Sequence, residues 1–240
     1  MNSITKEEKH MKTSVKWMAL AAFTVFTFAA QAQVSLGLRG GYQMANINAT
    51  KGLDALAPDF KTIDAFSIGA VMEVPLGYGF NFQPELAYSR KGFSIQESTA
   101  LDLFNIPVPV GVEALSRFDY LEAPLLMKYK FGDGRVNAYI AAGPTFGYAL
   151  DGQLITRANA LVDIKLIDTD IDLNAINYER FEVAGTVAGG LSFYTPFGQL
   201  FLDARYNHGF TQVYDIPVVD EKARNKSFGI NVGFMVPIGG

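Results

Sequence analysis

The sequence contains no cysteine, one tryptophan and two histidines among 240 residues. The absence of cysteine excludes a disulfide scaffold, a zinc–thiolate site and a cysteine nucleophile. The formal net charge of −4 gives no support to nucleic-acid binding, which usually requires a basic surface. We therefore expect no nucleic-acid partner. After residue 33, no run approaches the roughly 18 consecutive apolar residues that would predict a transmembrane helix.

The N-terminal region has the pattern of a secretory signal peptide. Two lysines precede an uncharged apolar run at 18–30, and the tripeptide AQA before Gln33 gives an A-x-A cleavage site. Such a run is too short to span a bilayer as a helix. We predict a cleaved signal peptide over residues 1–32, of which residues 1–10 are an extension upstream of the true start.

The predicted mature domain, 33–240, alternates between apolar and small polar residues. In the stretch FNFQPELAYSRKG (80–92), Phe80 and Phe82 share one face while Gln83 lies on the other. Alternation with a period of two is the pattern of a β-strand. The same pattern predicts eight strands, at 34–46, 65–74, 80–92, 118–131, 136–148, 178–194, 199–210 and 226–238.

The connections between these strands alternate in length. Tight glycine-rich turns (PLGYG, GDGR and TPFG) alternate with loops that are unusually long for a compact domain. Short turns at one end, long loops at the other and an even strand count are typical of bacterial outer-membrane barrels. The sequence therefore predicts an all-β fold, an eight-stranded antiparallel up-and-down transmembrane β-barrel located in the cell outer membrane. Both termini would then lie in the periplasm.

A soluble, lipocalin-like barrel would alternate in the same way. Its charged residues would face outward, whereas here the polar face consists mostly of Gly, Ser, Asn, Gln and Thr, which suit a narrow lumen. This favours the membrane barrel, with outer-membrane lipid around it. Aromatic residues near the strand ends predict girdles at the two membrane interfaces. The predicted girdle contains Tyr42, Phe80, Tyr88, Tyr129, Phe131, Phe193 and Tyr206.

Charged residues on the polar face would point into the lumen. These are Arg39, Glu73, Glu85, Glu122, Lys128, Glu182, Asp203 and Arg205. Eight strands leave an interior just wide enough for side chains, and buried charges must be paired. We therefore favour a network of paired charges that fills the lumen over a proton or ion path. The proposed pairs are Glu85 with Lys128 and Glu182 with Arg205.

No catalytic, cofactor or metal site can be assigned, so we expect a non-enzymatic protein without a cofactor. His208 is the only histidine of the mature domain, and Asp203 has the opposite strand parity, so the two would face different sides. The acidic run at 168–174 is spaced like the start of a calcium loop but lacks the required glycine. We favour an extension of the sixth strand there, and a weak divalent site remains the alternative.

Four stretches resemble the PorT-like outer-membrane β-barrel family, often called porin family proteins. They are LGLRGGYQMANI, FQPELAYSRKG, YLEAPLLMKYKF and AYIAAGPTFGY, and the resemblance covers nearly all of the mature domain. It implies an eight-stranded barrel in the outer membrane of a Gram-negative bacterium and leaves the activity open. Such barrels commonly end in an aromatic residue, whereas here Phe234 is followed by MVPIGG.

The sequence thus predicts a barrel with a side-chain-filled lumen and a structural or protein-interaction role. The loops at 93–117 and 149–177 are apolar for external segments, which suggests mutual packing or a protein partner. Three alternatives remain open: an accessory membrane component of a protein secretion or transport assembly, a small-solute channel, and a lipid-modifying enzyme.

Prolines occupy the interior of three successive predicted strands. Pro84, Pro124 and Pro144 cannot donate a ladder hydrogen bond, and a closed barrel has no edge at which to place them. We predict a bulge or a missing ladder bond at each proline.

Overall fold

A computed structural model gives the arrangement of most of the chain. It describes residues 33–48, 60–103, 106–132, 134–159, 163–171, 173, 178–211, 214–215 and 222–238. The predicted signal peptide at 1–32 lies outside these residues. Within the described ranges, no helix is long and apolar enough to cross a membrane.

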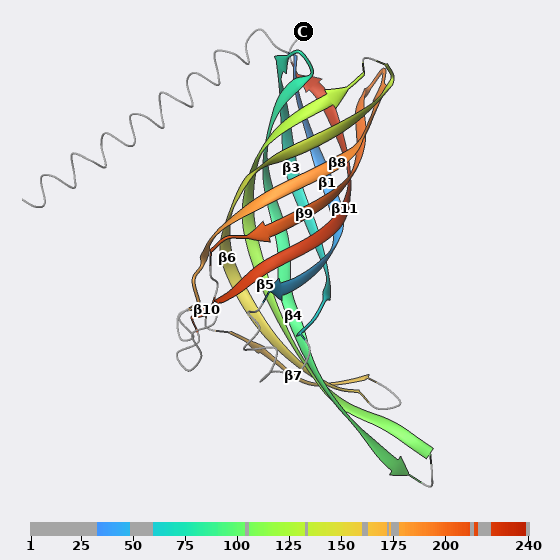
Figure 1. Cartoon of the computed structure of the whole chain (residues 1–240), viewed down its shortest axis with the longest axis vertical. Helices are drawn as coiled ribbons and strands as arrows, with labels where there is room; N and C mark the ends of the chain where they lie inside the picture. Colours follow the sequence, from blue (N-terminus) through green and yellow to red (C-terminus); the bar gives the residue numbers. More distant parts are fainter. Residues whose placement is uncertain are drawn as a thin grey trace, which may run out of the picture.

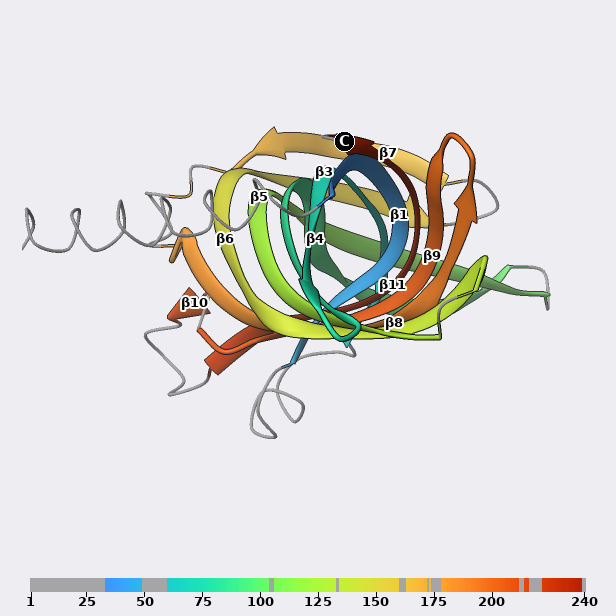
Figure 2. The same cartoon turned by 90° about the horizontal axis from the view of Figure 1, so that it is seen from above.

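Eight long antiparallel strands form a closed barrel (Figures 1 and 2). Each strand pairs with the next, and the last pairs with the first to close the sheet. The strands are β1 (Val34–Asn48), β3 (Ile63–Gly77), β4 (Phe80–Leu103), β5 (Ile106–Phe131), β6 (Val136–Asn159), β8 (Phe181–Thr195), β9 (Gly198–Gly209) and β11 (Lys222–Ile238). The predicted eight-stranded all-β barrel is confirmed. Three short strands, β2 (Phe60–Lys61), β7 (Asp163–Asp170) and β10 (Tyr214–Asp215), pair with β4, β6 and β11.

The two ends of the barrel differ, and we call them the turn end and the loop end. At the turn end, short connections join β3 to β4, β5 to β6 and β8 to β9. Tyr78 and Gly79 join β3 to β4 with φ angles of 53° and 83°, as a two-residue type I′ hairpin requires. At the loop end, the sheet continues past the barrel (Figure 1).

The strands at the loop end are longer than the sequence pattern indicated. The predicted loop at 93–117 is mostly an extension of β4 and β5, which stay paired as far as Leu103 and Ile106. The predicted loop at 149–177 contains the end of β6 and the paired strand β7. Continued pairing satisfies backbone groups that a loop would leave to water. The predicted extension of the sixth strand through 168–174 is wrong, because β8 begins only at Phe181 and β7 pairs with β6.

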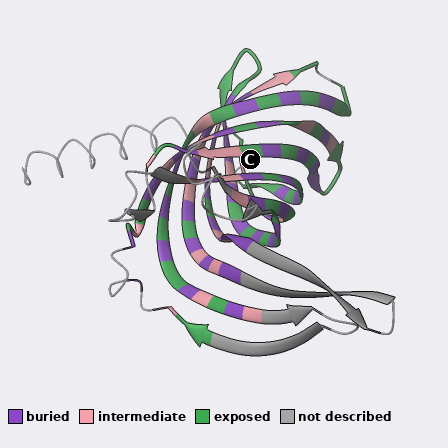
Figure 3. Ribbon diagram, turned by 60° about the horizontal axis from the view of Figure 1, so that its bottom comes forward, coloured by how far each residue is buried: buried purple, intermediate pink, exposed green. Residues whose placement is uncertain are grey.

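Burial alternates along most of each described strand, and the buried residues face the lumen (Figure 3). Large hydrophobic residues face outward, including Leu38 at 66% exposed and Val187 at 58%. Arginine, glutamate, asparagine and serine side chains face inward and are buried. This is the reverse of a soluble barrel and matches a barrel whose outer surface meets lipid.

The three interior prolines interrupt the ladder as predicted. The β3–β4 ladder has a gap at Pro84, the β4–β5 ladder at Pro124 and the β5–β6 ladder at Pro144. In each case the gap lies toward the preceding strand, while pairing with the following strand continues. A proline lacks one donor, so it disrupts only one of the two ladders beside it.

Candidate functional site in the barrel lumen

Among the residues whose side chains are described, charges of both signs face the lumen in equal number. The five cations are Arg39, Lys91, Lys128, Lys130 and Arg205, and the five anions are Glu73, Glu85, Glu122, Glu182 and Asp203. Five positive and five negative charges leave a net charge of zero. All eight residues that the sequence placed in the lumen are buried there, and Lys91 and Lys130 join them.

The central cluster joins four strands through two arginines. Arg39 Nε lies 2.6 Å from Glu85 Oε2, and Arg205 Nη1 lies 2.8 Å from the same oxygen. Arg205 Nε also lies 2.9 Å from Asp203 Oδ1. Tyr139 donates a hydrogen bond of 2.8 Å to the other Asp203 oxygen. Every charge in this cluster therefore has an opposite charge in direct contact, as buried ions require.

A second cluster lies nearer the turn end. Lys128 Nζ lies 2.9 Å from Glu73 Oε2, and Lys130 donates to the other oxygen of the same carboxylate. The Lys128 ammonium also lies 3.8 Å from the centre of the Tyr139 ring, within range of a cation–π interaction. Lys130 donates a 2.5 Å hydrogen bond to the Tyr194 hydroxyl.

A third cluster lies nearer the loop end. Lys91 Nζ lies 2.8 Å from Glu122 Oε1 and 3.1 Å from Glu182 Oε2. Asn225 donates a 2.8 Å hydrogen bond to Glu182. Lys91 was not among the charges that the sequence pattern placed in the lumen, yet it is only 4% exposed.

The two ion pairs proposed from the sequence do not form. Glu85 contacts arginines, Lys128 contacts Glu73, and Glu182 contacts Lys91. The register explains the difference. Lys128 lies opposite Asn81, which is four residues from Glu85 and therefore about 13 Å away along the strand. Strand parity identifies the face on which a residue lies but not its height in the barrel.

The packing closes the lumen between its two ends. The cavity at mid-height, beside Arg39 and Pro124, has a volume of about 10 Å³, which is room for about one water molecule. At the turn end, a vestibule of about 410 Å³ opens outward and reaches Glu73, Lys130 and Tyr194.

An aromatic cluster closes the loop end. Phe118 stacks on Tyr178 with ring centres 4.7 Å apart, and Tyr178 shares a 2.5 Å hydrogen bond with the Tyr120 hydroxyl. Leu173 packs in the same buried cluster, together with Phe93. Residues of the predicted loop at 149–177 therefore lie over the barrel mouth.

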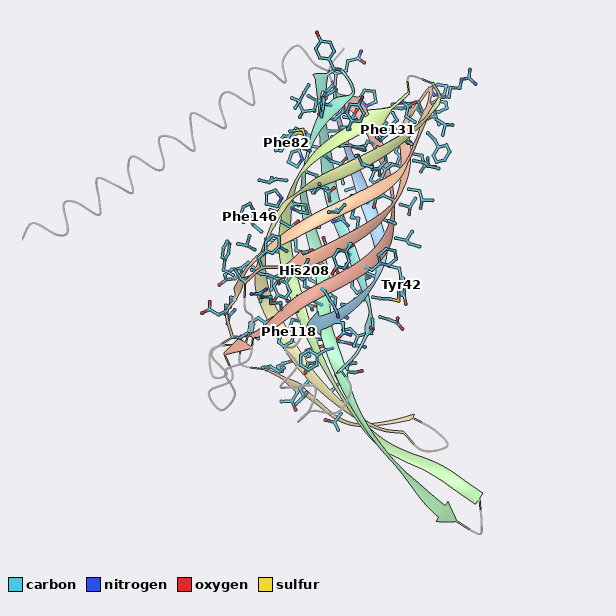
Figure 4. The ribbon with its side chains drawn as sticks, viewed as in Figure 1. Tyr42, Phe82, Phe118, Phe131, Phe146 and His208 are labelled. Carbon is cyan, nitrogen blue, oxygen red and sulfur yellow. The ribbon has the colours of Figure 1, made fainter. Side chains whose placement is uncertain are left out.

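The seven aromatic residues of the proposed girdle lie on the outer face. Tyr42, Phe80, Phe131 and Tyr206 are exposed, and Tyr88, Tyr129 and Phe193 are half-buried. Phe131 lies near the turn end and Tyr42 in the half nearer the loops (Figure 4). At the turn end, the Tyr129 ring centre lies 4.8 Å from that of Phe80 and 4.9 Å from that of Phe131.

The histidine and the acidic run do not come together as a reactive site. His208 lies on the outer face, where its ring centre is 6.3 Å from that of Tyr206, while Asp203 is buried in the lumen. Of the acidic run, Asp172 and Asn174 lie outside the described residues. Within the described part of the chain, no group of three or more acidic, histidine or cysteine side chains is placed to hold a metal ion.

Comparison with known proteins gives a family match over most of the barrel. Residues 29–215 match the family model described as outer membrane protein beta-barrel domain. None of the curated proteins matches the chain in sequence.

Several solved structures of outer-membrane proteins are similar. Neisserial surface protein A is 14% identical, covers 85% of this chain and 97% of its own, and gives a TM-score of 0.39. OprG from Pseudomonas aeruginosa is 10% identical, and the match covers 88% of this chain and 99% of OprG with a TM-score of 0.46. The attachment invasion locus protein Ail of Yersinia pestis is 12% identical, and the match covers 85% of this chain and 99% of Ail with a TM-score of 0.35.

Proposed function

Because the chain belongs to the outer membrane protein beta-barrel domain family, we propose that it is a non-enzymatic outer-membrane protein that binds a protein partner at its loop end. The barrel serves as the membrane anchor, and the sheet that extends past it offers the binding surface. The observation that carries this proposal is the continuous pairing of β4 with β5 as far as Leu103 and Ile106, beyond the closed part of the barrel.

The packing of the lumen favours this role over transport. Its ten charges are matched in sign, and the mid-height cavity of about 10 Å³ is too small for a hydrated solute. Aqueous channels in this class need about sixteen strands. We expect no steady conductance from the purified protein in planar bilayers, and steady conductance above background would favour the small-solute channel instead.

Among the described residues, one edge of the extension is open beyond Ile95. On the side away from β5, β2 pairs with β4 only at Ser94 and Ile95, and none of the other described residues pairs with β4 from there to Leu103. An unpaired strand edge is a template for a strand of another protein. A partner that supplies an extended segment would fit this edge, whether it acts alone or within a secretion or transport assembly. The four sequence stretches that resemble the PorT-like family favour a role within a protein secretion or transport assembly.

Removing the extension tests the proposal. Replacing residues 98–111 with Asn-Gly keeps the Glu97–Val112 pair and closes the hairpin with a tight turn. We expect the variant to fold and insert normally but to lose the partner that whole-cell crosslinking traps from position 97, which both variants retain. A Gly/Ser segment of the original length is the matched control, because it restores length without a strand, and it should also lose the partner. Partner capture by either variant at the wild-type level would contradict strand addition.

A further inference from the structure

An apolar groove crosses the outer wall of the barrel in the half nearer the loops. Its volume is about 400 Å³. The groove exists because small residues, Ala142, Gly143 and Gly185, form its floor across β6 and β8. The Phe210 ring closes one side and lies so near Gly185 that a Cβ there would be 2.7 Å from Phe210 Cζ.

One row of paired residues runs from this groove to a lysine. Pro144 pairs with Gly185, Gly185 with His208, and His208 with Lys226 on β11. Directly opposite residues of neighbouring strands have Cβ atoms roughly 5 Å apart. Lys226 therefore lies beside the groove, on the outer face, because its neighbours Asn225 and Ser227 are buried in the lumen.

A second cation lies one step further toward the loops. Arg224 is the next outward position on β11, and its Nε has no hydrogen-bond partner among the described residues. No ion pair joins Lys226 to any residue in the described ranges. This differs from Arg90, an outward-facing arginine on β4, which is paired with Asp119 at 2.7 Å.

The position of the groove limits what can fill it. His208 and Tyr42 lie in the half of the barrel nearer the loops (Figure 4), and Tyr42 belongs to the outward-facing aromatic residues. Short turns of outer-membrane barrels face the periplasm, so the loop end meets the outer leaflet. At this depth the surrounding molecules are lipids, and an apolar groove accommodates an acyl chain. Lys226 and Arg224, which form no ion pair within the described ranges, suit a phosphate.

We propose that the groove, with Lys226 and Arg224, binds lipid A, the phosphorylated and multiply acylated lipid of the outer leaflet. One acyl chain lies over Ala142 and Gly185, and a phosphate contacts the two cations, whose long side chains can extend to the headgroup level. This site is separate from the lumen and from the loop-end extension, so it does not depend on the proposed protein partner.

Native mass spectrometry of the purified full chain in detergent tests the site. The probes are lipid A, phosphatidylglycerol and phosphatidylcholine. Ala142→Phe fills the groove, and Lys226→Gln removes a cation. We expect each to weaken lipid A binding about tenfold, or about 1.4 kcal/mol, and Lys226→Arg to retain it. Two variants serve as matched controls. Ile140→Phe changes an outward residue on the same strand but outside the groove, and Arg90→Gln removes an outward cation on β4. Both should bind lipid A as the wild type does.

Three results would overturn the proposal. Wild-type affinity in both Ala142→Phe and Lys226→Gln would show that neither groove nor cation contributes. Equal binding of phosphatidylglycerol and lipid A would show a general site for anionic lipids. An equal loss in Ile140→Phe would show that any bulky change on the outer wall weakens lipid A binding. Folded mobility in unheated gels is checked for each variant, so that a folding defect is not taken for a loss of binding.

Discussion

Glu85 is the residue whose replacement most directly tests the paired lumen. Its Oε2 atom contacts both Arg39 and Arg205, at 2.6 and 2.8 Å. The substitution Glu85→Gln keeps the shape of the side chain and removes its charge. Arg205 would keep the carboxylate of Asp203, Arg39 would lose its only carboxylate in direct contact, and the net charge of the described lumen charges would change from zero to +1.

The size of the effect follows from what remains in contact. Removing one partner of a buried ion pair costs about 3–5 kcal/mol. Arg205 keeps Asp203, at 2.9 Å, and Arg39 keeps hydrogen bonds of 2.9 Å to Ser67 and 3.1 Å to Asn231. The glutamine oxygen can still accept one hydrogen bond. We therefore expect a loss of about 3 kcal/mol in the free energy of unfolding, at the lower end of that range.

The double variant Glu85→Gln with Arg39→Gln is the control. It restores a neutral lumen and keeps polar groups of nearly the same volume in place, so it should be less destabilised than Glu85→Gln alone. The two substitutions contact each other, so their effects should not add.

The measurement is urea unfolding of the barrel refolded into lipid vesicles, followed by circular dichroism. The single tryptophan of the sequence is Trp17, within the predicted signal peptide, so tryptophan fluorescence would not report on the mature barrel. A loss below about 1 kcal/mol for Glu85→Gln, within the range of ordinary substitutions, would refute the account of the lumen given above. A double variant less stable than the single one would refute it as well.

Two further predictions use the same unfolding measurement. Lys91→Met should lower the free energy of unfolding by about 3 kcal/mol or more, because it leaves Glu122 and Glu182 buried without their shared cation. A change within about 0.5 kcal/mol, as expected for a solvated lysine, would place Lys91 outside the lumen. Gly143→Ala should lower the free energy of unfolding by about 1–3 kcal/mol through overpacking, because its Cβ would lie 2.0 Å from a backbone oxygen of β5. Gly40→Ala is the control. Its Cβ meets nothing within 4 Å, so it should change the free energy of unfolding by less than about 0.5 kcal/mol. Equal effects of the two glycine substitutions would contradict the packing described for β5 and β6.

The barrel was predictable because it depends on a local pattern. Alternation identifies strands, and the sequence of short and long connections fixes their antiparallel order without any knowledge of distant contacts. The missing ladder bonds at Pro84, Pro124 and Pro144 were predictable for the same reason, since a proline lacks its donor wherever it stands. Each of these inferences needs only residues that are close in the sequence.

The ion pairs were not predictable, because they depend on the height of each residue in the barrel. Glu85 and Arg205 are 120 positions apart in the chain and contact each other across the lumen. Height follows from register, and register depends on all the intervening turns and gaps. Lys91 is different, because a signal was present: it continues the inward parity of Glu85 and Ser89. Its position next to the end of the predicted strand at residue 92 concealed this, because the pairing of β4 in fact continues well beyond that point.

The charges are balanced over the whole lumen but not within each cluster. The loop-end cluster has one cation, Lys91, for two carboxylates, whereas the turn-end cluster has Lys128 and Lys130 for one. The surplus positive charge at the turn end borders an open vestibule of about 410 Å³, where water can solvate it. The surplus negative charge lies beneath Tyr120, which is fully buried. Because an unsolvated charge costs more than a solvated one, removing Lys91 should destabilise the barrel more than removing Lys130, although each contacts a glutamate.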